Sequence, residues 1–439
     1  MLLRDPVHGL VVFEADDERV VLALLDTAEV QRLRRVRQLG LTSVVFPGAE
    51  HSRFAHALGT AHVMVRLLRR LAAPDAALDE ALQIDGHLRR TALAAALLHD
   101  LGHGPFSHLF EEVFPGGRHH EAWTGDIVND DTTEVHAALS GLDRELPARV
   151  ASLLSGDAGA AAPELLARSI SGALDVDRCD YLLRDSLMTG VRYGLYDLEW
   201  VLQSLRVGRV TPGSDRLVLA VDGRKGLPAL EGYFLGRQFM YQQVYHHKAT
   251  RGAECLVRAI FKRVVERVQD GHVPPLTPRA IVDASLGRQV ALGDYLAMDD
   301  VIVGSSFAAW ERGSDPLLAD LCARLRTRRL FKTVRLPDEP AAWPEARARA
   351  LDVVRSLGLR DDLYLWLDVA THVPYPEPDG ALDDAHDVVL VLEPGRGARP
   401  LGDASFLLGE LRNKAHVRPR LVFAPEARRA VVSALEGLA

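Results

Sequence analysis

One stretch limits what this chain can fold into: an apolar run that ends in an adjacent histidine and aspartate. Residues 93–98 contain only alanine and leucine, and His99 and Asp100 follow them directly. The glycines and proline of residues 102–105 then end the helix that such a run predicts. A buried helix that ends in imidazole and carboxylate groups presents metal ligands at the bottom of a cavity. The sequence therefore predicts a helical core with a metal site at this helix end.

Two further segments are candidates to complete this site. Adjacent residues on a helix point about 100° apart, so other parts of the chain must supply the remaining ligands. Upstream, residues 51–59 contain His56, and downstream, residues 175–185 contain both Asp175 and Asp177. The basic residue that follows Asp177 favours it over Asp175 as the fourth ligand, and Asp175 remains the alternative.

The order His, His-Asp, Asp, with its flanking residues, resembles the HD superfamily of metal-dependent phosphohydrolases. Three longer blocks, at residues 4–9, 31–40 and 46–48, resemble the SAM-and-HD-domain dNTP triphosphohydrolases and their bacterial relatives. The resemblance extends from Arg4 to about Lys332. It implies hydrolysis of deoxynucleoside triphosphates to deoxynucleoside and inorganic triphosphate.

By this resemblance, four residues are the metal ligands: His56, His99, Asp100 and Asp177. Two imidazoles and two carboxylates suit a divalent ion such as Mn, Fe, Zn, Co or Mg and leave positions for water and phosphate. The sequence does not choose among these ions.

Acid–base chemistry is expected from residues that follow the His-Asp pair. Histidine can donate or accept a proton near neutral pH, and the resemblance assigns His108 as the catalytic acid, accompanied by His120. Glu111 stands where these enzymes more often carry aspartate. The alternative is a polar network that only supports the metal ligands. The candidate catalytic residues are His103, His108, Glu111 and His120.

The resemblance also implies a nucleotide pocket. Tyr181 would pack under the ribose and leave no room for a 2′-hydroxyl, so deoxynucleotides would be preferred. Arg237 matches a contact to the γ-phosphate, whereas Gln38 and Arg53 match contacts to the sugar. The implied substrate residues are Gln38, Arg53, Arg178, Tyr181, Asp185, Arg237, Tyr241 and Tyr245.

Three residues near the N-terminus match an activator site that reads guanine at a subunit interface: Asp26, Gln31 and Arg34. A carboxylate accepts from the guanine N1 and N2 hydrogens, and Gln and Arg donate to O6 and N7. The alternative is an ordinary solvated helix face. The related enzymes carry a lysine before the block at residues 4–9, and this chain has only Met1-Leu2-Leu3 there. We expect a homo-oligomer, dimer or tetramer, activated by a guanine nucleotide.

The predicted fold is mainly α: an HD-domain helical bundle at residues 1–335 with an inserted β-hairpin near 205–226. Residues 231–268 are expected to form one long helix. Prolines 337, 340 and 344 mark a boundary, and residues 336–439 are expected to form a small α+β module.

Composition limits the functional class. The net charge of −8 argues against a general nucleic-acid-binding protein. The three widely spaced cysteines indicate no disulfide framework, which favours the cytoplasm, and no apolar run reaches the ~18 residues of a membrane span. Two alternatives stay open: another HD phosphohydrolase, such as a nucleotidase or phosphodiesterase, and a non-catalytic nucleotide-binding regulator.

Overall fold

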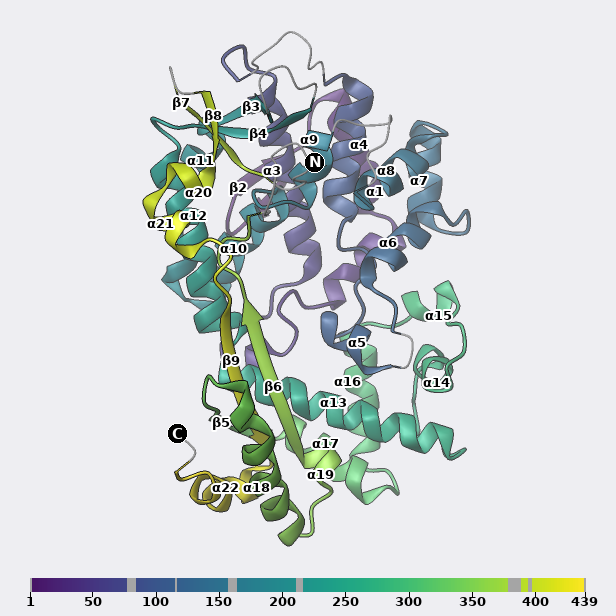
Figure 1. The fold of residues 1–439 in the computed structure, drawn as a ribbon. Coiled ribbons are helices and arrows are strands. Elements are labelled where there is room, and N and C mark those ends of the chain that lie inside the picture. The colour runs from purple at the N-terminus through teal and green to yellow at the C-terminus, as the bar shows by residue number, and fades with distance from the viewer. Residues whose placement is uncertain are drawn as a thin grey trace.

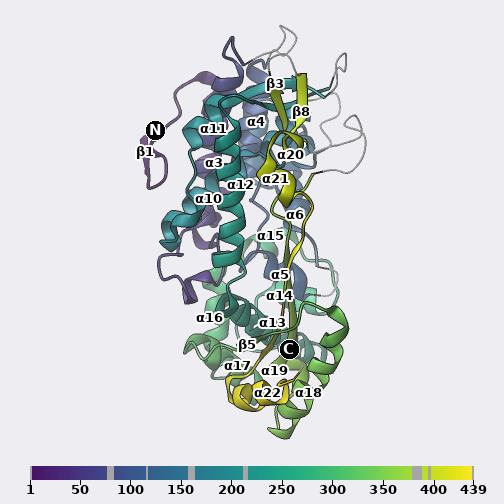
Figure 2. The same cartoon turned by 60° about the vertical axis from the view of Figure 1, so that its left-hand side comes forward.

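The computed structural model describes residues 2–76, 84–114, 117–156, 164–210, 216–377, 388–393 and 397–437, except for the side chains of residues 108–110 and 397. The chain is mainly α-helical and elongated, with helices at both ends and small sheets along one side (Figures 1 and 2). This confirms the predicted fold class. Within the described residues, no helix combines the length and apolar character needed to cross a bilayer.

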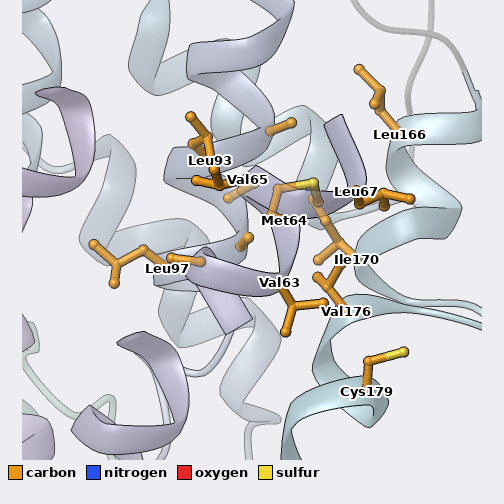
Figure 3. Packing of buried hydrophobic residues seen from close by; sticks show 14 of the residues in the cluster. Val63, Met64, Val65, Leu67, Leu93, Leu97, Leu166, Ile170, Val176 and Cys179 are labelled. Carbon is orange, nitrogen blue, oxygen red and sulfur yellow. The ribbon is translucent and has the colours of Figure 1, made fainter. Parts of the chain in front are cut away.

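The N-terminal half is a helical bundle around the predicted apolar helix. That helix, α4, is buried along residues 91–98 and packs against α3 and α8. Side chains from α3, α4, α9 and α10 interdigitate in the core, including Met64, Leu97 and Ile170 (Figure 3). The elements are β1 (Leu2–Asp5), β2 (Gly9–Val12), α1 (Arg19–Leu25), α2 (Ala28–Arg32), α3 (Arg53–Leu71), α4 (Gly86–Leu98), α5 (His108–Val113), α6 (His120–Asn129), α7 (Glu134–Leu142), α8 (Leu146–Leu154), α9 (Glu164–Ile170), α10 (Val176–Thr189) and α11 (Leu198–Ser204).

The predicted hairpin is present as β3 (Leu205–Arg209) and β4 (Leu217–Asp222), which pair antiparallel. Its expected turn, residues 212–215, lies outside the described residues. β7 (Leu390–Glu393) joins β4 in parallel, and β8 (Gly397–Pro400) pairs with β7. The C-terminal part of the chain thus extends a sheet that begins in the N-terminal half.

The expected long helix at residues 231–268 is instead two helices, and that prediction is wrong. α12 (Leu227–Met240) ends in a π turn at Tyr241–Tyr245, and α13 begins only at Lys248 and runs to Gln269. His247 caps α13 by accepting from the Ala249 amide, which fixes the start of the second helix. The next helices are α14 (Arg279–Ser285), α15 (Leu292–Leu296), α16 (Asp300–Trp310) and α17 (Pro316–Arg326).

The C-terminal part builds a second core together with α13–α17. β9 (His416–Phe423) lies between β5 (Lys332–Arg335) and β6 (Leu365–His372), antiparallel to both. One hydrophobic cluster includes Phe261, Phe331 and Val431, and so spans the predicted boundary at residue 335. The division into two domains therefore stays a prediction. The remaining helices are α18 (Trp343–Ser356), α19 (Asp361–Tyr364), α20 (Leu401–Ala404), α21 (Phe406–Leu411) and α22 (Arg428–Ala434).

Candidate functional site

Side chains from three helices meet where α4 ends, and they are the four predicted metal ligands. The Nε2 atom of His56 lies 2.9 Å from Asp177 Oδ1 and 3.2 Å from His99 Nε2. His99 Nε2 lies 3.5 Å from Asp177 Oδ1 and 3.5 Å from Asp100 Oδ1. Ligand atoms of His56, His99 and Asp177 all lie within 4.8 Å of one another. These two nitrogens and one oxygen could hold a divalent metal ion, and Asp100 lies 3.7 Å from His56 Nε2 while its ligand atom groups with His103 and His120.

Each histidine ligand is oriented through its other ring nitrogen. His99 Nδ1 donates to the Ala96 carbonyl over 3.0 Å, and His56 Nδ1 donates to Asp180 Oδ2 over 2.8 Å. Both contacts leave Nε2 directed at the cluster, which is how histidine ligands are fixed in metal sites. Burial alone would lower the pKa of His56, but hydrogen bonds to Asp177 and Asp180 raise that pKa to about 10.

Asp180 is a functional residue that the sequence analysis missed. Its carboxylate is fully buried and accepts from His56, from His8 over 2.7 Å, and from both Nε and Nη2 of Arg184. Arg184 Nη1 in turn donates to Asp5 Oδ2 over 2.8 Å. The hairpin β1–β2 is thereby tied to the metal site through two of its polar residues. The available signal was the position of Asp180, three residues after Asp177 on the same helix.

Gly59 on α3 faces this carboxylate. A Cβ at position 59 would collide with the Asp180 carboxylate and the Arg184 guanidinium. Only glycine admits the close approach of α10 to α3 at this point. The approach brings Asp177 within reach of His56.

Asp175, the alternative fourth ligand, caps α10 instead. Its Oδ1 accepts from the Arg178 amide over 2.7 Å, and Oδ2 accepts from the Gly172 amide over 2.8 Å. Burial raises the pKa of Asp175 to about 6. The structure thus gives Asp175 the role of a helix N-cap and places Asp177 in the cluster.

Three of the four predicted catalytic residues lie together beside Asp100. The rings of His103 and His120 are stacked, with centroids 3.7 Å apart and planes 14° apart. His120 Nδ1 lies 2.9 Å from Glu111 Oε1, and His103 Nε2 lies 3.2 Å from Asp100 Oδ1. Burial and the nearby Arg53 lower the pKa of His103 to about 4, so this ring is neutral at pH 7. The side chain of His108 lies outside the described part of the structure.

A cavity of about 560 Å³ opens onto the metal site from the side of α13. Asp100, Asp177, His103 and His120 lie at one end of it. Its walls include seven of the eight predicted substrate residues: Gln38, Arg53, Arg178, Tyr181, Asp185, Tyr241 and Tyr245. The eighth, Arg237, does not line the cavity, and its Nη1 donates to the Pro374 carbonyl over 3.0 Å.

Several of these wall residues are held by partners. Asp185 is buried, and its two oxygens lie 2.8 Å from His51 Nε2 and 2.8 Å from the Tyr245 hydroxyl. Arg53 pairs with the metal ligand Asp100 and also donates to Ser107 Oγ over 2.8 Å. Gln38 Oε1 is buried without a hydrogen-bond partner among the described residues, which leaves an acceptor available to a ligand.

The three predicted activator residues lie at the end of α1, near the end of α2 and in the 3₁₀ turn that follows it. Asp26 is exposed, at the end of α1. Gln31 Nε2 donates to the Leu25 carbonyl over 2.6 Å, and Gln31 Oε1 accepts from Arg34 Nε over 2.8 Å. The Arg34 guanidinium also covers the Phe54 ring, 3.6 Å from its centroid. A hydrogen bond therefore joins Gln31 to Arg34, whereas among the described residues no hydrogen bond or ion pair joins Asp26 to either of them.

Comparison with known proteins agrees with this geometry. A family model described as "HD domain" matches residues 53–185, the segment that carries all four ligands. YwfO of Bacillus subtilis, an uncharacterized protein, is 36% identical over 374 residues, which cover 85% of this chain and 80% of that protein. Bovine deoxynucleoside triphosphate triphosphohydrolase SAMHD1 is 28% identical over 371 residues, covering 76% of this chain and 58% of that protein.

Solved structures share the fold along nearly the whole chain. A phosphohydrolase from Bacteroides thetaiotaomicron superposes with a TM-score of 0.79 at 24% identity, covering 96% of this chain and 99% of that one. A hypothetical protein from Aquifex aeolicus gives 0.74 at 26% identity, covering 99% and 100%. Together with the ligand geometry, these similarities show that the chain belongs to the HD-domain family of phosphohydrolases, whose members bind divalent metal ions.

Proposed function

We propose that the protein hydrolyses deoxynucleoside triphosphates to deoxynucleoside and inorganic triphosphate. One observation carries this proposal: a single cavity joins the predicted metal ligands Asp100 and Asp177 to Tyr181, Asp185 and Arg178. Its volume of about 560 Å³ is in the range of small-molecule sites. The similarity to a deoxynucleoside triphosphate triphosphohydrolase supports the same substrate class.

The bound metal ion would polarise the scissile phosphoryl group and order the attacking water. His56, His99, Asp100 and Asp177 are the residues that would hold this ion. Glu111 Oε1 accepts a hydrogen bond from His120 Nδ1–H, so the proton that His120 gives to the leaving oxygen is a second one, carried on Nε2. His103, which is neutral, stacks on His120 and fixes the plane of its ring. We therefore assign proton transfer to the leaving oxygen to His120 and its orientation to Glu111 and His103.

The test uses the purified full-length protein with each dNTP and NTP under Mn, Mg and Co, with products separated by chromatography. Release of inorganic triphosphate supports the proposal. Stepwise release of phosphate indicates another HD phosphohydrolase, and tight nucleotide binding without turnover indicates a regulator. Asp177→Ala is the control that excludes a contaminating phosphatase.

We further propose that deoxynucleotides are preferred. Tyr181 lies beside the metal site, with its ring centroid 6.4 Å from that of His56, and Asp185 is held in place by His51 and Tyr245. A rigid wall of this kind excludes an extra hydroxyl, and a mismatched buried polar group costs about 1–3 kcal/mol. Turnover of GTP at the rate of dGTP would contradict this preference.

Activation by a guanine nucleotide in a homo-oligomer is a separate proposal. The hydrogen bond between Gln31 and Arg34 brings two of the three predicted contacts together on the surface. Hydrolysis of dATP would be measured with and without GTP, in parallel with sedimentation. Arg34→Ala should abolish the activation, which is typically about 5- to 150-fold in coupled sites, and leave basal turnover unchanged. A monomer that is fully active and indifferent to GTP refutes this proposal but not the catalytic assignment.

A further inference from the structure

The C-terminal strands hold the break between α12 and α13, the segment that carries two tyrosines of the cavity wall. From β9, Arg418 Nη1 donates to the Gln242 carbonyl over 3.0 Å, and Arg420 Nη2 donates to the His246 carbonyl over 2.9 Å. Carbonyl groups at a helix break need partners from outside the helix. β6 and β9 run side by side from the lower helices toward this region (Figure 1).

His372, the last residue of β6, packs on one of these tyrosines. Its ring is parallel to that of Tyr241, with centroids 3.5 Å apart and planes 7° apart. The side chain is buried, and its Nε2 has no hydrogen-bond partner among the described residues. The contact that His372 supplies to the site is therefore its ring face.

The residues that follow His372 also contact Arg237. The carbonyl of Pro374, two residues after His372, accepts from Arg237 Nη1, and the Arg237 guanidinium lies 5.5 Å from the Tyr241 ring centroid. Burial is the largest cause that lowers the pKa of His372 to about 3, and the positive charges of Arg237 and Arg178 lower this pKa further. Arg178 lines the cavity, and Arg237 lies beside the Tyr241 ring without lining the cavity, so this part of the wall is positively charged and suits a polyphosphate chain.

Aromatic rings connect this end to the metal site. Ring centroids are 6.4 Å apart for His56 and Tyr181, 6.2 Å for Tyr181 and Tyr245, and 4.9 Å for Tyr245 and Tyr241. A phosphate chain that begins at the predicted metal ligands and follows this row would have Tyr241 near its far end.

We propose that His372 is a positioning residue for the terminal part of the phosphate chain, so that the C-terminal sheet is part of the substrate site. His372 acts by holding Tyr241, and through Pro374 the same strand end holds Arg237. This inference rests on the proposed function, because it assumes a triphosphate substrate.

The test measures binding of inorganic tripolyphosphate and of dGMP to the full-length, metal-loaded protein by calorimetry. His372→Ala should weaken tripolyphosphate binding by roughly 3- to 10-fold, the range expected for loss of an aromatic stack, and leave dGMP binding unchanged. His372→Phe keeps the stack and should bind like the wild type. Thr371→Ala, at the exposed neighbouring position, is the matched control.

Three results would overturn the inference. The first is a His372→Ala variant that binds tripolyphosphate as tightly as the wild type. If only the melting temperature of this variant falls, the role of His372 is purely structural. The second is a His372→Phe variant that binds tripolyphosphate as weakly as His372→Ala, because the ring nitrogen rather than the ring face would then determine binding. The third is a wild-type protein that does not bind tripolyphosphate. Failure of the proposed function shows separately, as absence of dNTP turnover by the wild type.

Discussion

The two ends of the cavity are built in different ways. At the metal end, α3, α10 and the residues that follow α4 supply the predicted ligands from within one helical bundle, and the Asp180 carboxylate that orients His56 is fully buried. At the far end, Tyr241 comes from the π turn after α12 and stacks on His372, the last residue of β6, while Arg237 of α12, which does not line the cavity, donates to the Pro374 carbonyl. We infer that the residues of the metal end carry out the proposed hydrolysis, whereas the residues of the far end determine the affinity for the substrate.

The largest effect is expected from Asp177→Ala. Loss of a residue that only supports a metal ligand costs about 10- to 100-fold, so loss of the ligand itself should cost more and reduce the bound metal. Activity and metal content, the latter by mass spectrometry, are the measurements. Asp175→Ala is the matched control, because it removes a helix cap worth about 1 kcal/mol and should keep the metal. Normal activity with bound metal in Asp177→Ala would remove this residue from the ligand set.

Removal of the proton-transfer group comes next. His120→Ala should lower kcat by about 10²- to 10⁴-fold without loss of metal, because general acid–base catalysis contributes that much. Glu111→Gln tests the orientation of the same ring and should have a smaller effect in the same direction. If kcat is unchanged in His120→Ala, another residue transfers the proton. His108 is then the remaining candidate from the sequence.

A purely steric change at the metal end should also lower the affinity for the metal ion. Gly59→Ala introduces a methyl group against Asp180 and Arg184, displaces the carboxylate that orients His56, and should weaken metal binding by about 10- to 100-fold. Gly141→Ala on α7 is the control, because a Cβ there meets nothing within 4 Å. Metal titration of the two variants compares them directly, and equal affinities would show that Asp180 does not depend on this close approach.

The smallest effect belongs to the far side of the cavity. Tyr245→Phe removes one hydrogen bond to Asp185, so KM for dNTPs should rise by roughly 3- to 10-fold with kcat nearly unchanged. Tyr196→Phe removes a comparable hydrogen bond, to the Cys179 carbonyl, from a residue that does not line the cavity. A fall in kcat rather than a rise in KM for Tyr245→Phe would break the proposed division between the two ends.

The signals from which the metal end is predicted are local in the sequence. The apolar run, His99-Asp100 and the pattern around Asp177 each lie on one helix or at its end, where spacing determines direction. The sequence analysis missed Asp180, whose partners His8 and Arg184 come together only in the folded chain.

The far end could not be predicted in the same way. Residues 231–268 have no proline to end a helix, and the residues of β9 that bond to the break at Gln242 and His246 lie more than 170 positions further along the chain. Arg237 and Pro374 are 137 positions apart, and no periodicity in the sequence relates them. We expected a separate C-terminal module and therefore predicted no contact between it and α12. In the structure, strands β5 and β9 pair across the predicted boundary.

The placement of β9 has a consequence for protein synthesis. Arg418 and Arg420 lie close to the C-terminus, and they hold the turn at Gln242 and His246. A ribosome makes all four metal ligands long before it makes these arginines, and domains begin to fold while synthesis continues. An unfinished chain can therefore assemble the metal end while the far end still lacks its support. Full affinity for substrate should appear only after β9 has been made and has paired with β6.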